Sequence, residues 1–150
     1  MASATYAELI KIRWGLTLEG AGSSGASTTT ISMGIELSSL INHLTIDKFY
    51  IKGDGGSNSV IYVKNGYVKN LKISNCILDG EGDSNPDRKG FYGLYIGETL
   101  TITGTTFQNF YHWYLVDNTH SSHDVPLQLK HVVFTNNIVT NCKGSIAFRG

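Results

Sequence analysis

Leu71-Lys-Ile-Ser-Asn-Cys-Ile-Leu-Asp-Gly80 is the stretch that decides the fold, because the same pattern returns along most of the chain. Successive copies start 28, 27, 29 and 32 residues apart, at Leu16, Leu44, Leu71, Leu100 and Val132. Each start is followed two positions later by another apolar residue, as expected for a strand with one buried face. Self-similarity at this period predicts a solenoid.

The ninth position after each start contains only two residue types, in the order Gly25, Gly53, Gly80, Asn109 and Asn141. Glycine and asparagine enter the left-handed backbone region at the lowest cost. We therefore predict the same left-handed corner in every copy.

A second strand is expected after each corner, because alternating apolar residues recur there as well. The predicted members are Ile31–Met33, Ile61–Val63, Leu94–Ile96, Tyr114–Val116 and Ile146–Phe148. Two or three short strands joined by glycine or asparagine corners describe one coil of a parallel β-helix, with coils stacked about 4.8 Å apart.

The opening of the first copy adds a family resemblance. Leu16-Thr-Leu-Glu-Gly-Ala-Gly22, followed by Thr28-Thr-Thr-Ile31, is similar to the first coil of the pectin-lyase-like superfamily. The resemblance covers residues 16–150 and implies an all-β, right-handed, single-stranded parallel β-helix of about five coils. That superfamily includes polysaccharide lyases, glycoside hydrolases, pectin esterases, phage tailspikes and surface proteins, so the fold leaves the function open.

The two ends of the chain lead to different expectations. Residues 1–15 are predicted to form an N-terminal cap segment, either a helix over residues 5–12 or a strand through Ile10, Ile12 and Trp14. Residues 144–150 have the pattern of a strand in mid-coil and carry no cover. We expect residues 16–150 to be one β-helix domain that is part of a longer solenoid, or a homo-oligomer formed through this uncapped C-terminal coil.

Composition narrows the classes of partner. Twelve basic and 12 acidic residues leave no net charge to attract nucleic acid, and no apolar run is long enough for a membrane span. The N-terminus lacks the features of a signal peptide, so the compartment stays open between an intracellular location and an extracellular one reached through a leader that has been removed. Cys76 and Cys142 fall in different coils and are expected to be unbridged core thiols.

Several asparagines fall at the predicted bends. We expect their side-chain amides to satisfy backbone groups from coil to coil. These residues are Asn70, Asn75, Asn136 and Asn137.

Two long connections interrupt the regular pattern. Residues 81–90 are polar and rich in turn formers, and residues 118–131 contain His120, His123 and Asp124. Long loops on a regular scaffold often carry binding and catalytic residues. We expect these two loops to wall a groove over the second strand row, while the spacing of the histidines matches no metal motif.

The predicted floor of the groove places Tyr62 beside Tyr95, as an aromatic platform on which a sugar ring stacks. Lys64 and Arg149 stand in the next outward column and, with His120 and His123, complete the predicted substrate-binding set. The competing interpretation is that these are ordinary exposed cross-strand neighbours.

The catalytic candidates are three aspartates and two cations. A polysaccharide lyase needs a base and a cation or Ca²⁺ beside a uronate, whereas a glycoside hydrolase needs two carboxylates that face the bond. No cofactor is expected except Ca²⁺ in the lyase case. A non-catalytic scaffold or assembly module is the alternative to both enzymes. The candidates are Asp79, Asp117, Asp124, Arg88 and Lys89.

Overall fold

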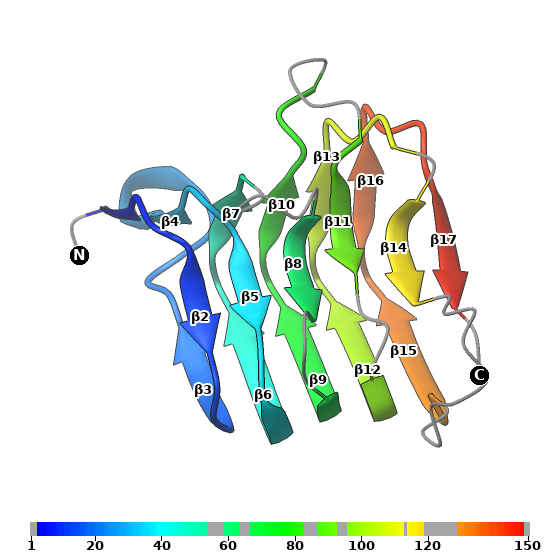
Figure 1. The fold of residues 1–150 in the computed structure, drawn as a ribbon. Coiled ribbons are helices and arrows are strands. Elements are labelled where there is room, and N and C mark those ends of the chain that lie inside the picture. Colours follow the sequence, from blue (N-terminus) through cyan, green and yellow to red (C-terminus); the bar gives the residue numbers. More distant parts are fainter. Residues whose placement is uncertain are drawn as a thin grey trace.

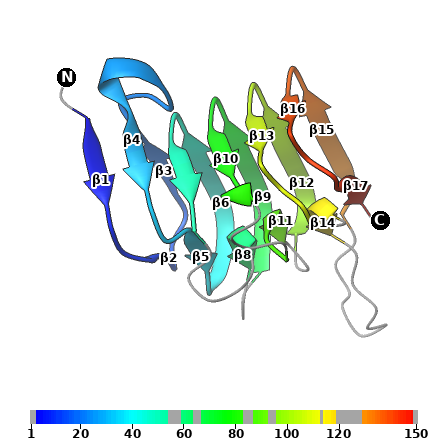
Figure 2. The same cartoon turned by 90° about the horizontal axis from the view of Figure 1, so that it is seen from above.

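The chain forms a parallel β-solenoid. The computed structural model describes residues 3–53, 59–63, 67–82, 87–92, 96–112, 114–118 and 129–148. Its strands pass in turn through three parallel sheets, named A, B and C here, and successive coils lie side by side from one end of the molecule to the other (Figures 1 and 2). A short 3₁₀ turn lies at Gly25–Ser27, between β3 and β4.

Each sheet takes one strand from each coil. Sheet A contains β1 (Ala4–Tyr6), β4 (Thr29–Ile31), β7 (Tyr50–Lys52), β10 (Ile77–Asp79), β13 (Thr106–Gln108) and β16 (Ile138–Thr140). Sheet B contains β2 (Ile10–Ile12), β5 (Ile35–Leu37), β8 (Ser59–Val63), β11 (Lys89–Tyr92), β14 (Tyr114–Asn118) and β17 (Ser145–Phe148). Sheet C contains β3 (Leu16–Glu19), β6 (Leu40–Asp47), β9 (Tyr67–Ser74), β12 (Ile96–Thr103) and β15 (His131–Thr135).

This architecture confirms the predicted all-β parallel solenoid, and the sheets of six, six and five strands are close to the expected five coils. The right-handed coil and membership of the pectin-lyase-like superfamily stay predictions. No helix in the described ranges is long and apolar enough to cross a membrane.

The repeat starts form one inward column of sheet C. Strand pairing joins the starts in the predicted register, from Leu16 beside Leu44 to Leu100 beside Val132. The interior members are fully buried, as are the matching apolar residues of sheet A. The core is therefore a stack of similar apolar layers, and the side chains of each inner layer pack against those of the coils on both sides.

The predicted corners exist at four of the five ninth positions. Gly25, Gly53, Asn109 and Asn141 have positive φ angles, whereas at Gly80 the left-handed residues are the following Glu81 and Gly82. A second left-handed corner lies between sheets C and A, at the bend where Asn75 and Asn136 were expected; only its left-handed backbone was not predicted. It falls at the fourth repeat position, with positive φ at Lys48, Asn75, Gly104 and Asn136.

The predicted second strand row was partly wrong. Ile61 pairs with Ile35 and Phe91, so β5 and β11 replace the predicted strands at 31–33 and 94–96. Ile31 lies in sheet A and Ile96 in sheet C. Apolar and polar residues alternate with a period of two in every strand, so the pattern alone does not show which strand of one coil pairs with which strand of the next. When the connection before a strand varies in length, the prediction can select the wrong segment.

The N-terminal segment is built from strands, not from a helix. β1 pairs with β4, and β2 pairs with β5 through Ile10 and Ile12. Of the two predicted forms of the N-terminal cap, the strand is thus right for Ile10 and Ile12. The segment that covers the next coil consists of strands of the same solenoid.

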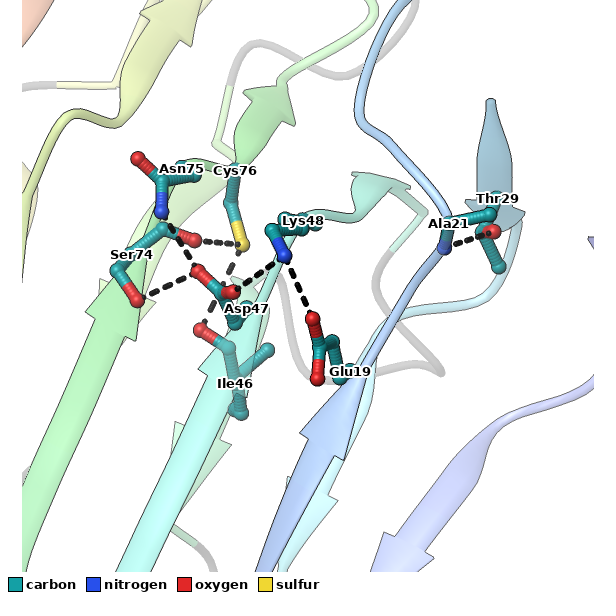
Figure 3. Close-up of polar contacts among 9 residues, drawn as sticks. All are labelled: Glu19, Ala21, Thr29, Ile46, Asp47, Lys48, Ser74, Asn75 and Cys76. Carbon is teal, nitrogen blue, oxygen red and sulfur yellow. Dashed lines mark hydrogen bonds and ion pairs between the residues drawn. The ribbon is translucent and has the colours of Figure 1, made fainter. Parts of the chain in front are cut away.

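A polar bend joins sheets C and A at the end of β6 (Figure 3). Asp47 Oδ1 accepts hydrogen bonds from Ser74 Oγ at 2.7 Å and from Asn75 Nδ2 at 2.8 Å. Lys48 Nζ lies 2.6 Å from Glu19 Oε1 and 3.7 Å from Asp47 Oδ2. These contacts tie three successive coils together at one corner, and they raise the pKa of Lys48 chiefly through the hydrogen bond to Glu19.

At the bends, the expected bonds to backbone groups are made by Asn137, whereas the Asn75 amide donates to the Asp47 side chain; of the two thiols expected in the core, Cys76 is buried and Cys142 is partly buried. Asn137 accepts from the Thr105 backbone N–H and donates to the Ile102 carbonyl, both at 2.9 Å. Cys76 Sγ points to the carbonyls of Ser74 and Ile46 (Figure 3). Cys76 and Cys142 are both free thiols.

Candidate functional site

The outward column of sheet B is where a groove floor was expected. Pairing places Glu36 beside Tyr62, Tyr62 beside Tyr92, and Tyr92 beside Asp117. The neighbour of Tyr62 is thus Tyr92, and the prediction of Tyr95 in that place is wrong. Asp117 therefore lies in the same column as Tyr62, and only its backbone position is described.

Tyr62 does not offer an exposed ring for stacking. Tyr62 and Glu36 are each only 5% exposed, and the Tyr62 hydroxyl donates to Glu36 Oε2 at 2.6 Å. The predicted platform is therefore absent at this residue, because the outer face of β8 is covered. Glu36 was missed by the sequence analysis, although its place between Ile35 and Leu37 is the alternation typical of a strand.

Lys89 is directed to an aromatic ring. Its Nζ lies 4.2 Å from the centroid of the Tyr92 ring, within the range of a cation–π interaction. This contact holds the lysine on its own strand, β11.

Asp79 is buried at the end of β10 and accepts four hydrogen bonds. Oδ2 accepts from the Tyr50 hydroxyl and from Gln108 Nε2 at 2.7 Å. Oδ1 accepts from the Glu81 backbone N–H at 2.8 Å and from Asn109 Nδ2 at 3.1 Å. The donors come from three successive coils, so this carboxylate joins coils in the same way as Asp47.

The ionisation of Asp79 matches this structural role. Burial opposes the charge, but the hydrogen bonds outweigh it and lower the pKa of Asp79 below its ordinary value. Burial, together with the hydrogen bond to Asp79, raises the pKa of Tyr50. An ionised carboxylate with its lone pairs occupied is a weak proton acceptor for a substrate.

Arg88 belongs to the same corner. This buried side chain forms an ion pair with Glu81, which also lies 3.4 Å from Lys52 Nζ. The pairing register places Lys52 beside Asp79, although the ion pair of Lys52 is with Glu81.

The described candidates therefore occupy separate faces. Asp79 and Arg88 both contact Glu81 at the corner after sheet A, whereas Tyr62, Lys89 and Asp117 belong to sheet B. No group of three or more histidine, cysteine, aspartate or glutamate side chains in the described part of the chain could hold a metal ion. The remaining predicted site residues lie outside the described residues; they are Lys64, Tyr95, His120, His123, Asp124 and Arg149.

A groove that the sequence analysis did not predict lies on sheet C, at its N-terminal side. It encloses about 460 Å³ and is lined by Trp14, Gly15, Leu16, Thr17, Leu40, Asn42 and His43. Trp14 is 77% exposed and Leu40 is 70% exposed, the two highest values among the large apolar side chains of the described residues. The signal in the sequence was Trp14 itself, a large aromatic residue directly before Gly15.

Local sequence explains how this groove forms. Gly15 lets the chain pass close to β6, since a Cβ atom there would lie 2.8 Å from the His43 carbonyl oxygen. On the other side, Asn70 Nδ2 donates to the Asn42 carbonyl at 3.4 Å, and His43 pairs with Asn70 across the sheet. The groove thus lies where Trp14 precedes β3, the strand at the edge of sheet C, and faces residues of β6.

The lining combines an apolar wall with neutral polar groups. An indole ring and two leucines supply the wall, while an amide, an imidazole and a hydroxyl supply hydrogen-bonding groups, and no carboxylate is among them. In ligand pockets, apolar area provides affinity and a few polar groups provide orientation, and this groove offers both kinds of group.

No family model, curated protein or solved structure matches this chain.

Proposed function

We propose that this chain is a saccharide-binding β-solenoid, and that the groove at Trp14 holds the sugar. The observation that carries the proposal is the exposed indole beside a groove of about 460 Å³ with neutral polar groups. A sugar ring has a face of C–H groups and a rim of hydroxyls, so an aromatic face and nearby amide and imidazole groups complement it. The resemblance to a superfamily rich in polysaccharide-active proteins is a second support.

Binding without cleavage is the form of this function that we propose. Glu36 and Asp117 stand three strands apart in sheet B, or about 14 Å at the usual strand spacing. Glycosidases hold their two carboxyl groups roughly 5–9.5 Å apart. Asp79, the other described candidate, is already engaged by four donors.

The test is a binding and turnover screen against neutral and acidic oligosaccharides, with and without Ca²⁺. We expect binding by calorimetry, weakened about tenfold or more by Trp14→Ala, because truncation removes the stacking face. Met33→Ala is the matched control, since Met33 is also exposed and apolar but lies outside the groove.

Two outcomes would contradict the proposal. One is the absence of binding to every saccharide, and the other is binding that Trp14→Ala leaves unchanged. Unsaturated products or new reducing ends would show that the chain is a lyase or a hydrolase, in place of the binding module proposed here.

A further inference from the structure

Leu40 presents an exposed apolar side chain on an inner coil. It begins β6, and β3 and β9 lie on either side of that strand in sheet C (Figure 1). Leu40 is 70% exposed, whereas the next residue, Ile41, is fully buried. Since alternate side chains of a strand point to opposite faces, Leu40 points outward from the solenoid. Its exposure is thus a property of the outer face of sheet C.

Tyr67 continues this outward position in the next coil. The pairing register sets Tyr67 beside Leu40, and the Tyr67 backbone N–H donates to the Ser39 carbonyl at 3.1 Å. Tyr67 is half-buried and precedes the fully buried Val68, so it also points outward. Because Leu40 lines the groove at Trp14, an aromatic residue stands one strand beyond the groove, next to its apolar wall.

A glycine gives the Tyr67 ring its place. A Cβ atom at Gly97 would lie 1.6 Å from the Tyr67 hydroxyl oxygen and 2.1 Å from the ring carbon that carries it. The tip of the ring therefore lies directly against the backbone of β12. The register of β9 and β12 shifts at this point, where Gly97 and Glu98 stand opposite a single residue of β9. A β-bulge of this kind redirects the strand locally, and here it lies beside the ring.

The charges beside the ring are already paired. Lys69 Nζ lies 3.2 Å from Glu98 Oε1, so the carboxylate of an acidic sugar would compete with Glu98 for this lysine. Asn70 and Thr99 pair further along the same strands and add an amide and a hydroxyl. The surface from the groove to the ring thus favours a neutral ligand with many hydroxyl groups.

We propose that Leu40 and the Tyr67 ring form a second sugar subsite, which extends the groove at Trp14 across β6 and β9. This inference rests on the saccharide-binding function proposed above. Trp14, Leu40 and Tyr67 belong to three successive coils, so the two aromatic residues stand roughly 10 Å apart along the solenoid axis at the usual strand spacing. That span requires a chain of sugar units rather than a single ring. The ligand class is therefore a neutral, extended oligosaccharide, such as a β-1,4-linked hexose chain, that runs across the strands.

The test is calorimetry with β-1,4-linked glucose oligomers, from glucose to cellohexaose, and with oligogalacturonates of the same lengths. We expect the neutral series to bind more tightly, with an affinity that rises as the chain grows long enough to reach Tyr67. Tyr67→Ala should weaken the binding of cellohexaose about tenfold, because it removes a stacking face, and should leave the shortest oligomer that binds unaffected. Tyr67→Phe keeps the ring and should bind like the parent.

Gly97→Ala tests the position of the ring without removing it. The added methyl group displaces the tip of the Tyr67 ring from β12, so this variant should also bind cellohexaose more weakly than the parent. Tyr6→Ala is the matched control, since Tyr6 is an exposed tyrosine of sheet A that lies outside the groove. Circular dichroism checks that each variant is folded.

Three results would overturn the second subsite: an affinity that does not depend on chain length, tighter binding of the galacturonates, or full affinity for cellohexaose in Tyr67→Ala. If Trp14→Ala still weakens binding in these cases, the groove stands and only the subsite fails. Binding of neither series refutes the ligand class named here, and the broader saccharide screen with Trp14→Ala then decides on the groove separately.

Discussion

Replacing Asp79 by alanine tests whether this carboxylate joins the coils or serves a substrate. Asp79 lies at the corner after β10, where its two oxygens accept from Tyr50, Gln108, Glu81 and Asn109. Asp79→Ala leaves all four donors without their charged acceptor. The variant should therefore lose stability even where no ligand is present.

The structure sets the size of this loss. A hydrogen bond to a charged group contributes about 1.5–3 kcal/mol to stability when it is buried. The side-chain bonds of Asp79 are partly buried, so water replaces some of them in the variant, and removing the buried charge recovers part of its desolvation. We expect a net loss of about 3 kcal/mol, which corresponds to a fall of roughly 6–12 °C in Tm for a chain of this size.

The assay is urea unfolding followed by circular dichroism, with Tm as a second measure. Glu19→Ala is the matched control, because Glu19 also ends a strand and contacts a cation, Lys48, but both side chains are largely exposed. Its urea midpoint should stay within error of the parent. Asp79→Asn should fall between the two, since it keeps the shape and one acceptor oxygen while the Tyr50 hydroxyl can turn and accept.

The reasoning is refuted if Asp79→Ala unfolds at the same urea concentration as Glu19→Ala, with unchanged slopes. The four hydrogen bonds of Asp79 would then contribute nothing to the free energy of unfolding. A destabilised Asp79→Ala that still binds saccharide would instead agree with both the structural role of this residue and the groove at Trp14.

Further predictions concern pH, backbone conformation and thiols. Because the pKa of Asp79 is lowered in the folded chain, its contribution is present above its unfolded pKa of about 3.9 and is lost as the pH falls through the folded value. Parent and Asp79→Asn should thus converge in stability in strong acid, and a constant difference would contradict this. Gly53→Ala should cost about 3 kcal/mol or more and Gly25→Ala only about 1 kcal/mol in urea unfolding. Both have positive φ, but a Cβ at Gly53 would lie 2.1 Å from a backbone oxygen and one at Gly25 meets nothing within 4 Å; equal losses would be inconsistent with that clash. Burial raises the pKa of the Cys76 thiol to about 12 and also raises the pKa of Cys142, which is less buried. A thiol reagent at mildly alkaline pH should therefore modify Cys142 first and Cys76 only on unfolding, and rapid labelling of Cys76 in the native protein would disprove its burial.

The sequence by itself determined the repeat, and with it the register of sheet C. Leu16, Leu44, Leu71, Leu100 and Val132 pair as their spacing predicts. Most of the glycine and asparagine corners were also predictable, because φ preference is a property of the single residue and its side chain. Such local rules act over a few residues, so reading the chain in order is enough to find them.

Only the tertiary structure decided what the coils bring together. The connections before β5 and β11 vary in length, so alternation alone did not reveal that Tyr62 stands between Glu36 and Tyr92. The burial of Tyr62 and Asp79, and the groove beside Trp14, depend on neighbours about 25–30 residues away in the sequence, one coil away in space. A side chain's exposure and partners are set by that stacking, and a residue's own identity does not contain them.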